Sequence, residues 1–133
     1  EIRLAQNYLK GKMAAAIESV CKSEDIIKAR EEVSKVKISD GVLAYIREIV
    51  EKTRKDSQLV LGASPRAFLS LIRASQARAY LSGRDYLKPD DVKAVAINVL
   101  HHRLVFSSDA RKQKSDMDVL IRNLIISVKV PTE

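Results

Sequence analysis

The sequence predicts an all-α protein, a compact helical bundle with at most a few very short strands. Two observations carry this prediction. Apolar side chains recur at steps of three and four residues along most of the 133 residues, which is the spacing of one helix face. Helix start signals, a serine or aspartate followed by acidic residues or proline, divide this pattern into segments. No repeat of fixed period and no low-complexity tract interrupts it.

The first half of the chain contains three candidate helices. The first covers residues 1–21 with an interruption near Gly11, because apolar side chains recur there at helical steps: Ile2, Ala5, Leu9, Met13, Ile17 and Val20. The second begins at Ser23, a suitable N-cap, and continues through Ile26, Ala29, Val33 and Val36 on one face. The third begins at Ser39 and ends in a cluster of cations, which suits the C-terminal end of a helix dipole.

The middle of the chain combines a short extended segment with the best-defined helix. Residues 59–61 are three apolar residues after a polar turn and predict a short strand. The next helix has Ser64 as its N-cap and Pro65 in its first turn. It ends near Ser82, with Gly83 as its stop.

The last third of the sequence predicts two more helices and a terminal strand. One helix extends to Arg103, and a polar loop covers residues 107–114. Ser115, with Asp118 three residues later, has the pattern of a capping box and begins the last helix. The alternation of apolar and polar residues over 126–130 predicts a strand at the C-terminal end.

The net charge of +7, from 24 Lys and Arg against 17 Asp and Glu, raises the hypothesis of nucleic-acid binding. The excess is spread along the chain, since residues 1–22, 23–57, 58–100 and 101–133 carry +2, 0, +3 and +2. Tryptophan is absent and 5% of the residues are aromatic, so few rings can stack on bases. A solvated surface is therefore the favoured explanation. A basic helical nucleic-acid-binding domain, with helix-turn-helix-like segments around residues 40–82, is the alternative.

The common catalytic and metal-binding motifs are absent from the sequence. It has no phosphate-binding loop and no His-Glu-x-x-His motif. His101 and His102 are adjacent, so on a helix they point about 100° apart and do not suit one metal ion. Asp90 and Asp91 follow a proline, where a helix dipole favours acids without any catalytic role. Cys21 is the single cysteine, which excludes an internal disulfide.

Cellular location is constrained by what the sequence lacks. No apolar run approaches the roughly 20 residues that a membrane helix needs, and no segment has the pattern of a signal peptide. A lone thiol suits the cytosol, and we expect a cytoplasmic protein with no membrane partner. The chain begins at Glu1 rather than with a methionine, so we expect it to be a piece of a longer protein.

The helix that begins after Ser64 has an unusual outer face. On a wheel of about 100° per residue its core face contains Phe68, Leu71, Ile72, Ser75 and Ala79. The opposite side carries Arg66 and Arg73 among apolar neighbours: Leu69, Ala74, Ala77, Tyr80 and Leu81. Such a surface indicates contact with another protein or with a bound anion. Arg66 also lies in the first turn, where free backbone N–H groups favour phosphate, although a generic helix start with a solvated arginine is the alternative.

The segment Gly62-Ala63-Ser64-Pro65-Arg66-Ala67 resembles the sensor 2 motif of the MoxR family of AAA+ ATPases. Other residues occur in the order of that family's C-terminal lid: Ser39-Asp40, Val42, Tyr45-Ile46, Thr53-Arg54, Gly83-Arg84-Asp85-Tyr86, Pro89-Asp90-Asp91-Val92, Val99-Leu100 and His102-Arg103. The match covers residues 23–105 well and the tail loosely. The resemblance implies a helical bundle of the AAA+ lid type.

The resemblance also implies a division of the chain. Residues 23–133 would form the AAA+ lid domain. The stretch from Asn7 to Lys22 matches the family poorly, so residues 1–22 would be a helical connector from a missing ATPase core.

In the MoxR family, a nucleotide-binding core with Walker A, Walker B and sensor 1 elements precedes the lid, and this sequence contains none of them. Matched position by position, Arg66 would be the sensor 2 arginine that reaches the γ-phosphate of ATP. The turn that aims it would be shaped by Gly62, Ala63, Ser64 and Pro65. The missing core would supply Mg²⁺. Arg84 and Arg103 also match family positions and would have structural or interface roles.

The resemblance implies a function for the full-length protein rather than for the chain alone. That protein would couple ATP binding and hydrolysis to the remodelling of partner proteins, often ones with a von Willebrand factor A domain. Its lid would contact its own core and neighbouring subunits of a hexameric ring, and the isolated chain would be inactive. A third hypothesis is a plain adaptor bundle that contacts proteins through Leu69, Tyr80 and Leu81.

Overall fold

The computed structural model describes residues 1–11 and 18–131, with the side chain of Leu4 left out. Most of the described chain is helical, and the helices are α1 (Ile2–Leu9), α2 (Ser23–Lys35), α3 (Asp40–Lys55), α4 (Pro65–Leu81), α5 (Pro89–Leu100), α6 (Ser108–Lys112) and α7 (Met117–Ile126). A 3₁₀ turn, His101–Arg103, follows α5. The only sheet among these residues pairs β1 (Leu59–Leu61) with β2 (Val105–Phe106). The all-α prediction is confirmed.

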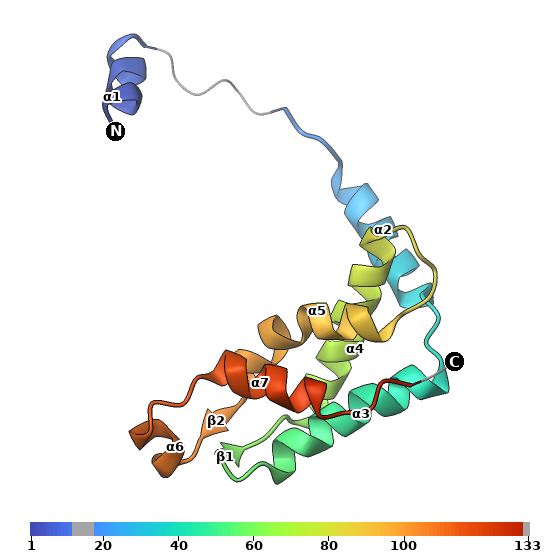
Figure 1. The fold of residues 1–133 in the computed structure, drawn as a ribbon. Helices are drawn as coiled ribbons and strands as arrows, with labels where there is room; N and C mark the ends of the chain where they lie inside the picture. Colours follow the sequence, from blue (N-terminus) through green and yellow to red (C-terminus); the bar gives the residue numbers. More distant parts are fainter. Residues whose placement is uncertain (12–17, 132–133) are drawn as a thin grey trace.

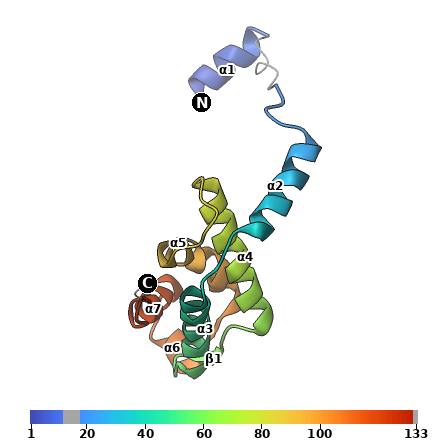
Figure 2. The same cartoon turned by 90° about the vertical axis from the view of Figure 1, so that its right-hand side faces the viewer.

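Helix α4 connects the parts of the bundle (Figure 1). It contacts α2, α3 and α5, while α7 packs across α5 and α3. The small sheet closes one end, beside the end of α3 and the short α6. Figure 2 shows α2 extending outward from the bundle beside α4. The bundle therefore presents the start of α4 at the end where the sheet lies.

The core lies where α3, α4, α5 and α7 meet. Each of these helices contributes side chains that are essentially inaccessible to solvent: Ile46, Ile49, Leu71, Val92, Leu100 and Ile121. Their spacing along each helix follows the three- and four-residue steps of the sequence pattern. Burial of these apolar side chains is the main stabilising contribution, about 1.5–3 kcal/mol for each.

Two of the predicted helix starts are confirmed by their caps. The hydroxyl of Ser39 accepts a hydrogen bond from the backbone N–H of Val42 (3.3 Å), and α3 begins at the next residue. The hydroxyl of Ser64 accepts one from the N–H of Ala67 (3.2 Å), and α4 begins at Pro65. Each cap satisfies a backbone donor that the helix itself leaves unpaired.

Two predicted caps are displaced by one residue. Helix α2 has its N-cap at Lys22, because the Asp25 carboxylate accepts a hydrogen bond from the Lys22 backbone N–H (2.8 Å). Helix α7 is capped by Asp116 rather than Ser115, since the Asp116 carboxylate accepts from the N–H groups of Asp118 and Val119. At α7 an aspartate caps the helix as well as a serine would. The sequence signal therefore locates the turn where a helix begins better than it identifies the N-cap residue.

The first predicted helix is shorter than its apolar pattern. Helix α1 ends at Leu9, and Gly11 follows with a φ of +62°, which confirms the interruption there. Val20 lies outside any helix and is exposed. The apolar positions Met13 and Ile17 of the same prediction lie outside the described residues.

The C-terminal third differs from the prediction in four places. The helix predicted to reach Arg103 ends at Leu100 and tightens into the 3₁₀ turn, and the predicted loop 107–114 contains α6. The predicted strand at 126–130 is absent, because Ile126 ends α7 and Val128 packs into the core without a strand partner. β1 instead pairs antiparallel with β2, which the sequence analysis did not predict.

Candidate functional site

The turn between β1 and α4 is held against the end of α3 by buried hydrogen bonds. The hydroxyl of Thr53 accepts a hydrogen bond from the backbone N–H of Ala63 (2.9 Å) and donates one to the carbonyl of Val50 (2.6 Å). Thr53 and Ala63 are both about 1% exposed. Arg54 adds a second link, because its Nε donates to the carbonyl of Ala63 (2.7 Å). Ala63 is therefore fixed through both of its backbone polar groups.

Gly62 lies so close to α3 that no side chain fits. A Cβ at this position would lie 2.6 Å from the Cα of Arg54 and 2.7 Å from the backbone oxygen of Thr53. Contacts this short with backbone atoms require the chain to shift. Gly62 is thus needed for close approach rather than for an unusual backbone angle.

The first turn of α4 leaves one backbone donor unpaired within the described part of the chain. Pro65 has no N–H, the N–H of Ala67 bonds to the Ser64 hydroxyl, and the N–H of Phe68 bonds to the Ser64 carbonyl (3.1 Å). This leaves the N–H of Arg66. No acidic residue occupies this turn, so the positive end of the helix dipole is uncompensated there.

The guanidinium of Arg66 belongs to the same turn. Arg66 is exposed, and it forms none of the ion pairs found among residues 1–11 and 18–131. A guanidinium next to a free helix N–H group suits an anion with several oxygens, such as a phosphate. The structure therefore brings the predicted site residues together: Gly62, Ala63, Ser64, Pro65 and Arg66.

The two faces of α4 follow the helical wheel except at Tyr80, which was predicted on the outer face but is half-buried and packs against the core. Leu71, Ser75 and Ala79 are fully buried, and Phe68 and Ile72 are packed against the core. Ala67 and Gln76 are also buried, which the wheel did not assign. On the outer face Leu69 is 58% and Leu81 is 81% exposed. Around the helix axis, the exposed Arg66 and Arg73 lie between these two leucines.

Arg84 has a structural partner. Its Nη1 donates to Asp91 Oδ2 (2.8 Å), its Nη2 donates to Asp91 Oδ1, and Asp91 is 5% exposed. Burial alone would raise the pKa of Asp91. The hydrogen bonds from Arg84 and from the Lys88 backbone N–H outweigh burial, so the pKa lies below its ordinary value. The pair ties the turn after α4 to the start of α5.

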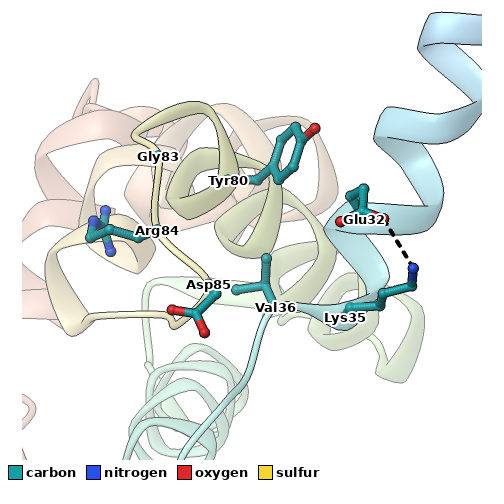
Figure 3. Close-up of a pocket in the computed structure, with 7 residues that line it drawn as sticks. All are labelled: Glu32, Lys35, Val36, Tyr80, Gly83, Arg84 and Asp85. Carbon is teal, nitrogen blue, oxygen red and sulfur yellow. Dashed lines mark hydrogen bonds and ion pairs between the residues drawn. The ribbon is translucent and has the colours of Figure 1, made fainter.

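A pocket of about 310 Å³ lies between the end of α2 and the turn after α4 (Figure 3). Arg84 points away from the other labelled side chains, and Glu32 is paired with Lys35 (3.0 Å). The lining is Glu32, Lys35, Val36, Tyr80, Gly83, Arg84 and Asp85. Its charged groups all have ion-pair partners: Glu32 and Lys35 pair with each other, whereas Arg84 pairs with Asp91 and Asp85 with Lys37 outside the lining, so the pocket offers little to an anion.

The two histidines have separate polar neighbours, and the cysteine lies apart from them on an exposed segment. His101 Nδ1 lies 2.6 Å from Asp118 Oδ1, and Arg103 Nε donates to His102 Nε2 (3.2 Å). Cys21 is exposed. Among the residues whose placement is described, no three His, Cys, Asp or Glu side chains gather as metal ligands would. No helix in the same part of the chain has the length and apolar character to cross a membrane.

The comparison with known families identifies the class of this bundle. Residues 51–122, more than half of the chain, match the AAA lid domain family, and this range contains the α3–α4 junction and Arg66. The chain therefore belongs to the AAA lid domain family. Within this class it is a lid domain of the MoxR family of AAA+ ATPases, since it is 30% identical to Chaperone MoxR1 over 93% of its length.

Two curated relatives cover most of the chain. The uncharacterized protein YeaC of Bacillus subtilis is 38% identical over 117 residues, which is 88% of this chain and 37% of YeaC. Chaperone MoxR1 of Mycobacterium tuberculosis is 30% identical over 93% of this chain and 35% of its own length. A crystal structure from Cytophaga hutchinsonii, of a protein regarded as an ATPase, superposes with a TM-score of 0.85 and 27% identity. The superposed region covers 98% of this chain and 43% of the Cytophaga hutchinsonii chain. The chain thus spans little more than a third of the curated relatives it matches.

Proposed function

We propose that Arg66 is the sensor 2 arginine of a MoxR-type ATPase and contacts the γ-phosphate of ATP in the full-length protein. The observation that carries this proposal is the exposed guanidinium of Arg66, which has no ion-pair partner among the described residues and lies in a first helical turn that has no acid of its own. ATP would be held by the ATPase core, which would also supply Mg²⁺. The arginine would add positive charge where negative charge develops on the phosphate.

The role of Gly62, Ala63, Ser64 and Pro65 would be to position this arginine. Thr53 and Arg54 fix Ala63 to the end of α3, and Ser64 caps α4 one residue later. A displacement of Arg66 on binding a phosphate would therefore be transmitted to both α3 and α4. This connection supports the idea that the lid moves as a unit when nucleotide binds or is hydrolysed.

The remaining parts of the proposal concern the full-length protein. Its lid would contact its own ATPase core and the neighbouring subunits of a ring, which we propose to be hexameric. The ring would remodel partner proteins, including ones with a von Willebrand factor A domain, in the cytoplasm. The similarity to a protein called Chaperone MoxR1 supports this direction.

The proposal is tested by nucleotide preference. In a full-length protein that carries this lid, we expect Arg66→Ala to weaken binding of a non-hydrolysable ATP analogue at least about tenfold and to leave ADP binding nearly unchanged, because ADP has no γ-phosphate. Arg122, an exposed arginine on α7, provides the matched control Arg122→Ala. Equal weakening of both nucleotides, or of neither, would contradict a γ-phosphate contact.

The isolated chain provides a second test. It contains no phosphate-binding loop, so we expect residues 1–133 alone to show neither ATP hydrolysis nor tight ATP binding. Hydrolysis by the purified chain that persists in the Arg66→Ala variant would contradict the assignment of a lid without catalysis of its own.

A further inference from the structure

A second surface, distinct from the turn at Arg66, lies between α2 and the C-terminal part of α4. It is a groove of about 680 Å³, lined by Ile26, Ala29, Arg30, Val33, Ser34, Arg73, Gln76, Ala77, Tyr80 and Leu81. We call it the α2–α4 groove. Figure 2 shows α2 extending away from the bundle beside α4.

The walls of the α2–α4 groove are fixed at one end. Gln76 of α4 is buried, and its Nε2 donates a hydrogen bond to the carbonyl of Val36 directly after α2 (2.9 Å). Val36 is itself part of the core, at 5% exposed. A groove held in this way is formed before any ligand binds, which lowers the entropic cost of binding.

The α2–α4 groove exposes apolar side chains that the rest of the described chain does not cover. Helix α2 buries none of its own residues, and Ile26 is 50% exposed on the groove side. Leu81 on the opposite wall is 81% exposed. Contiguous apolar surface of this kind marks an interaction site on a soluble domain.

The charged side chains that line the α2–α4 groove have one sign. Its lining contains two arginines, Arg30 and Arg73, and no acidic residue. At about 100° per residue, the lining positions of α2 fall on one side of the helix. The acids of α2 fall on the opposite half: Glu24, Asp25, Glu31 and Glu32. The groove therefore complements an apolar ligand with negative charges at its edges.

Two candidate occupants, a second copy of this chain and its own helix α1, fit this charge pattern poorly. A second copy arranged about a two-fold axis would bring the arginines of both grooves toward one another. Helix α1 is amphipathic, but Arg3 and the adjoining Lys10 outnumber Glu1 among its charged groups. Neither a two-fold arrangement of two copies nor α1 therefore brings an excess of acids to Arg30 and Arg73.

We propose that the α2–α4 groove is a docking site for an amphipathic helix of a partner protein that carries acidic residues on both flanks of its apolar stripe. The stretch from Ile26 to Val33 rises about 10 Å, which matches two helical turns. The partner helix would therefore insert apolar anchors at i, i+3 or i+4, and i+7, and its acids would meet Arg30 and Arg73. The proposal does not depend on the role of Arg66.

A designed peptide tests the proposal directly. The probe is a dye-labelled helical peptide with leucines at i, i+3, i+4 and i+7 and glutamates on both flanks, and a second peptide has lysines in place of the glutamates. Fluorescence anisotropy with residues 1–133 measures both affinities. We expect the acidic peptide to bind at least about tenfold more tightly than the lysine peptide.

Two isoleucines of α2 give a matched pair of variants. Ile26 lines the groove, whereas Ile27, at 56% exposed, does not. Both are half exposed, so neither aspartate substitution should unfold the bundle, which circular dichroism checks. We expect Ile26→Asp to weaken binding of the acidic peptide at least about tenfold and Ile27→Asp to change its affinity less than about twofold.

Charge reversal separates this site from a non-specific apolar surface. The double variant Arg30→Glu with Arg73→Glu should reverse the preference in favour of the lysine peptide, and Arg122→Glu on α7 should not. The proposal is overturned if neither peptide binds, if both bind equally, or if Ile26→Asp has no effect. It is also overturned if sedimentation shows a dimer of the chain that Ile26→Asp dissociates, because the occupant would then be a second copy.

Discussion

The hydroxyl of Thr53 lies 2.9 Å from the backbone nitrogen of Ala63 and accepts its hydrogen bond inside the core. Ten residues separate the two in sequence, yet this contact joins the last turn of α3 to the turn that begins α4. Arg66 follows three residues after Ala63. The position of the exposed arginine is therefore set by a buried polar contact on a different helix.

Removal of this hydroxyl should destabilise the bundle. Thr53→Val keeps the side-chain shape but leaves the buried N–H of Ala63 without a partner, which costs about 1–3 kcal/mol of unfolding free energy. Urea denaturation measures the change. Ser82→Ala, which removes an exposed hydroxyl bonded to the carbonyl of Arg78, is the control and should stay within about 0.5 kcal/mol of the parent. Equal effects of the two substitutions would count against the Thr53 link.

Two glycines should respond differently to the same substitution. Gly83 has a φ of +71° but open space around a new Cβ, so Gly83→Ala should cost about 1 kcal/mol through backbone strain. Gly62→Ala places a Cβ 2.6 Å from the Cα of Arg54 and should cost more, because the turn or α3 must shift. Thermal unfolding of both variants ranks them. A smaller loss at Gly62 would show that the approach of this turn to α3 is looser than described.

The Arg84–Asp91 pair should make stability depend on acid pH. Because folding lowers the pKa of Asp91, the pair stabilises the fold above the unfolded pKa of about 3.9, and this contribution is lost as the pH falls through the folded value. Asp91→Asn should lower the unfolding free energy at neutral pH by about 1–3 kcal/mol and reduce the loss below about pH 4. The neighbouring Asp90, which is exposed, gives the control Asp90→Asn. An unchanged acid profile in Asp91→Asn would refute the assignment.

The positive charge of the chain should not produce appreciable DNA binding. The excess is spread over the sequence, and residues 23–57, which include all of α2 and α3, carry none of it. A salt titration of duplex DNA affinity measures this, since phosphate contacts give a steep dependence on salt concentration. We expect no binding at low salt. Binding with a steep slope would favour the nucleic-acid hypothesis instead.

The start of α4 shows what the sequence could predict. Ser64 and Pro65 act within a few residues of themselves, so the cap, the first turn and the exposure of Arg66 follow from local rules. The wheel likewise separated the core face at Leu71 from the outer face at Leu69. Local chemistry and one helical period placed Arg66 in an exposed first turn, and the resemblance to the MoxR family singled it out as a candidate site residue.

Long-range contacts explain most of what the sequence analysis missed. Thr53 and Arg54 were noted as part of the resemblance, but their bonds to Ala63 require two elements to meet in space. The pairing of β2 with β1 joins residues more than forty positions apart, and β2 has two residues. Val128 alternates with polar neighbours as a strand residue would, but it is buried beside α7, where no strand partner is described.

If Arg66 acts on ATP from the lid, its removal should change the turnover number of a full-length protein that carries this lid. We expect Arg66→Ala to lower kcat for ATP hydrolysis at least about tenfold, as expected for loss of a charge that stabilises the transition state. The variant should keep the circular dichroism spectrum and unfolding midpoint of the parent, because Arg66 is exposed and unpaired among the described residues. Unchanged turnover in a folded Arg66→Ala protein, with Arg122→Ala alongside it, would contradict the account.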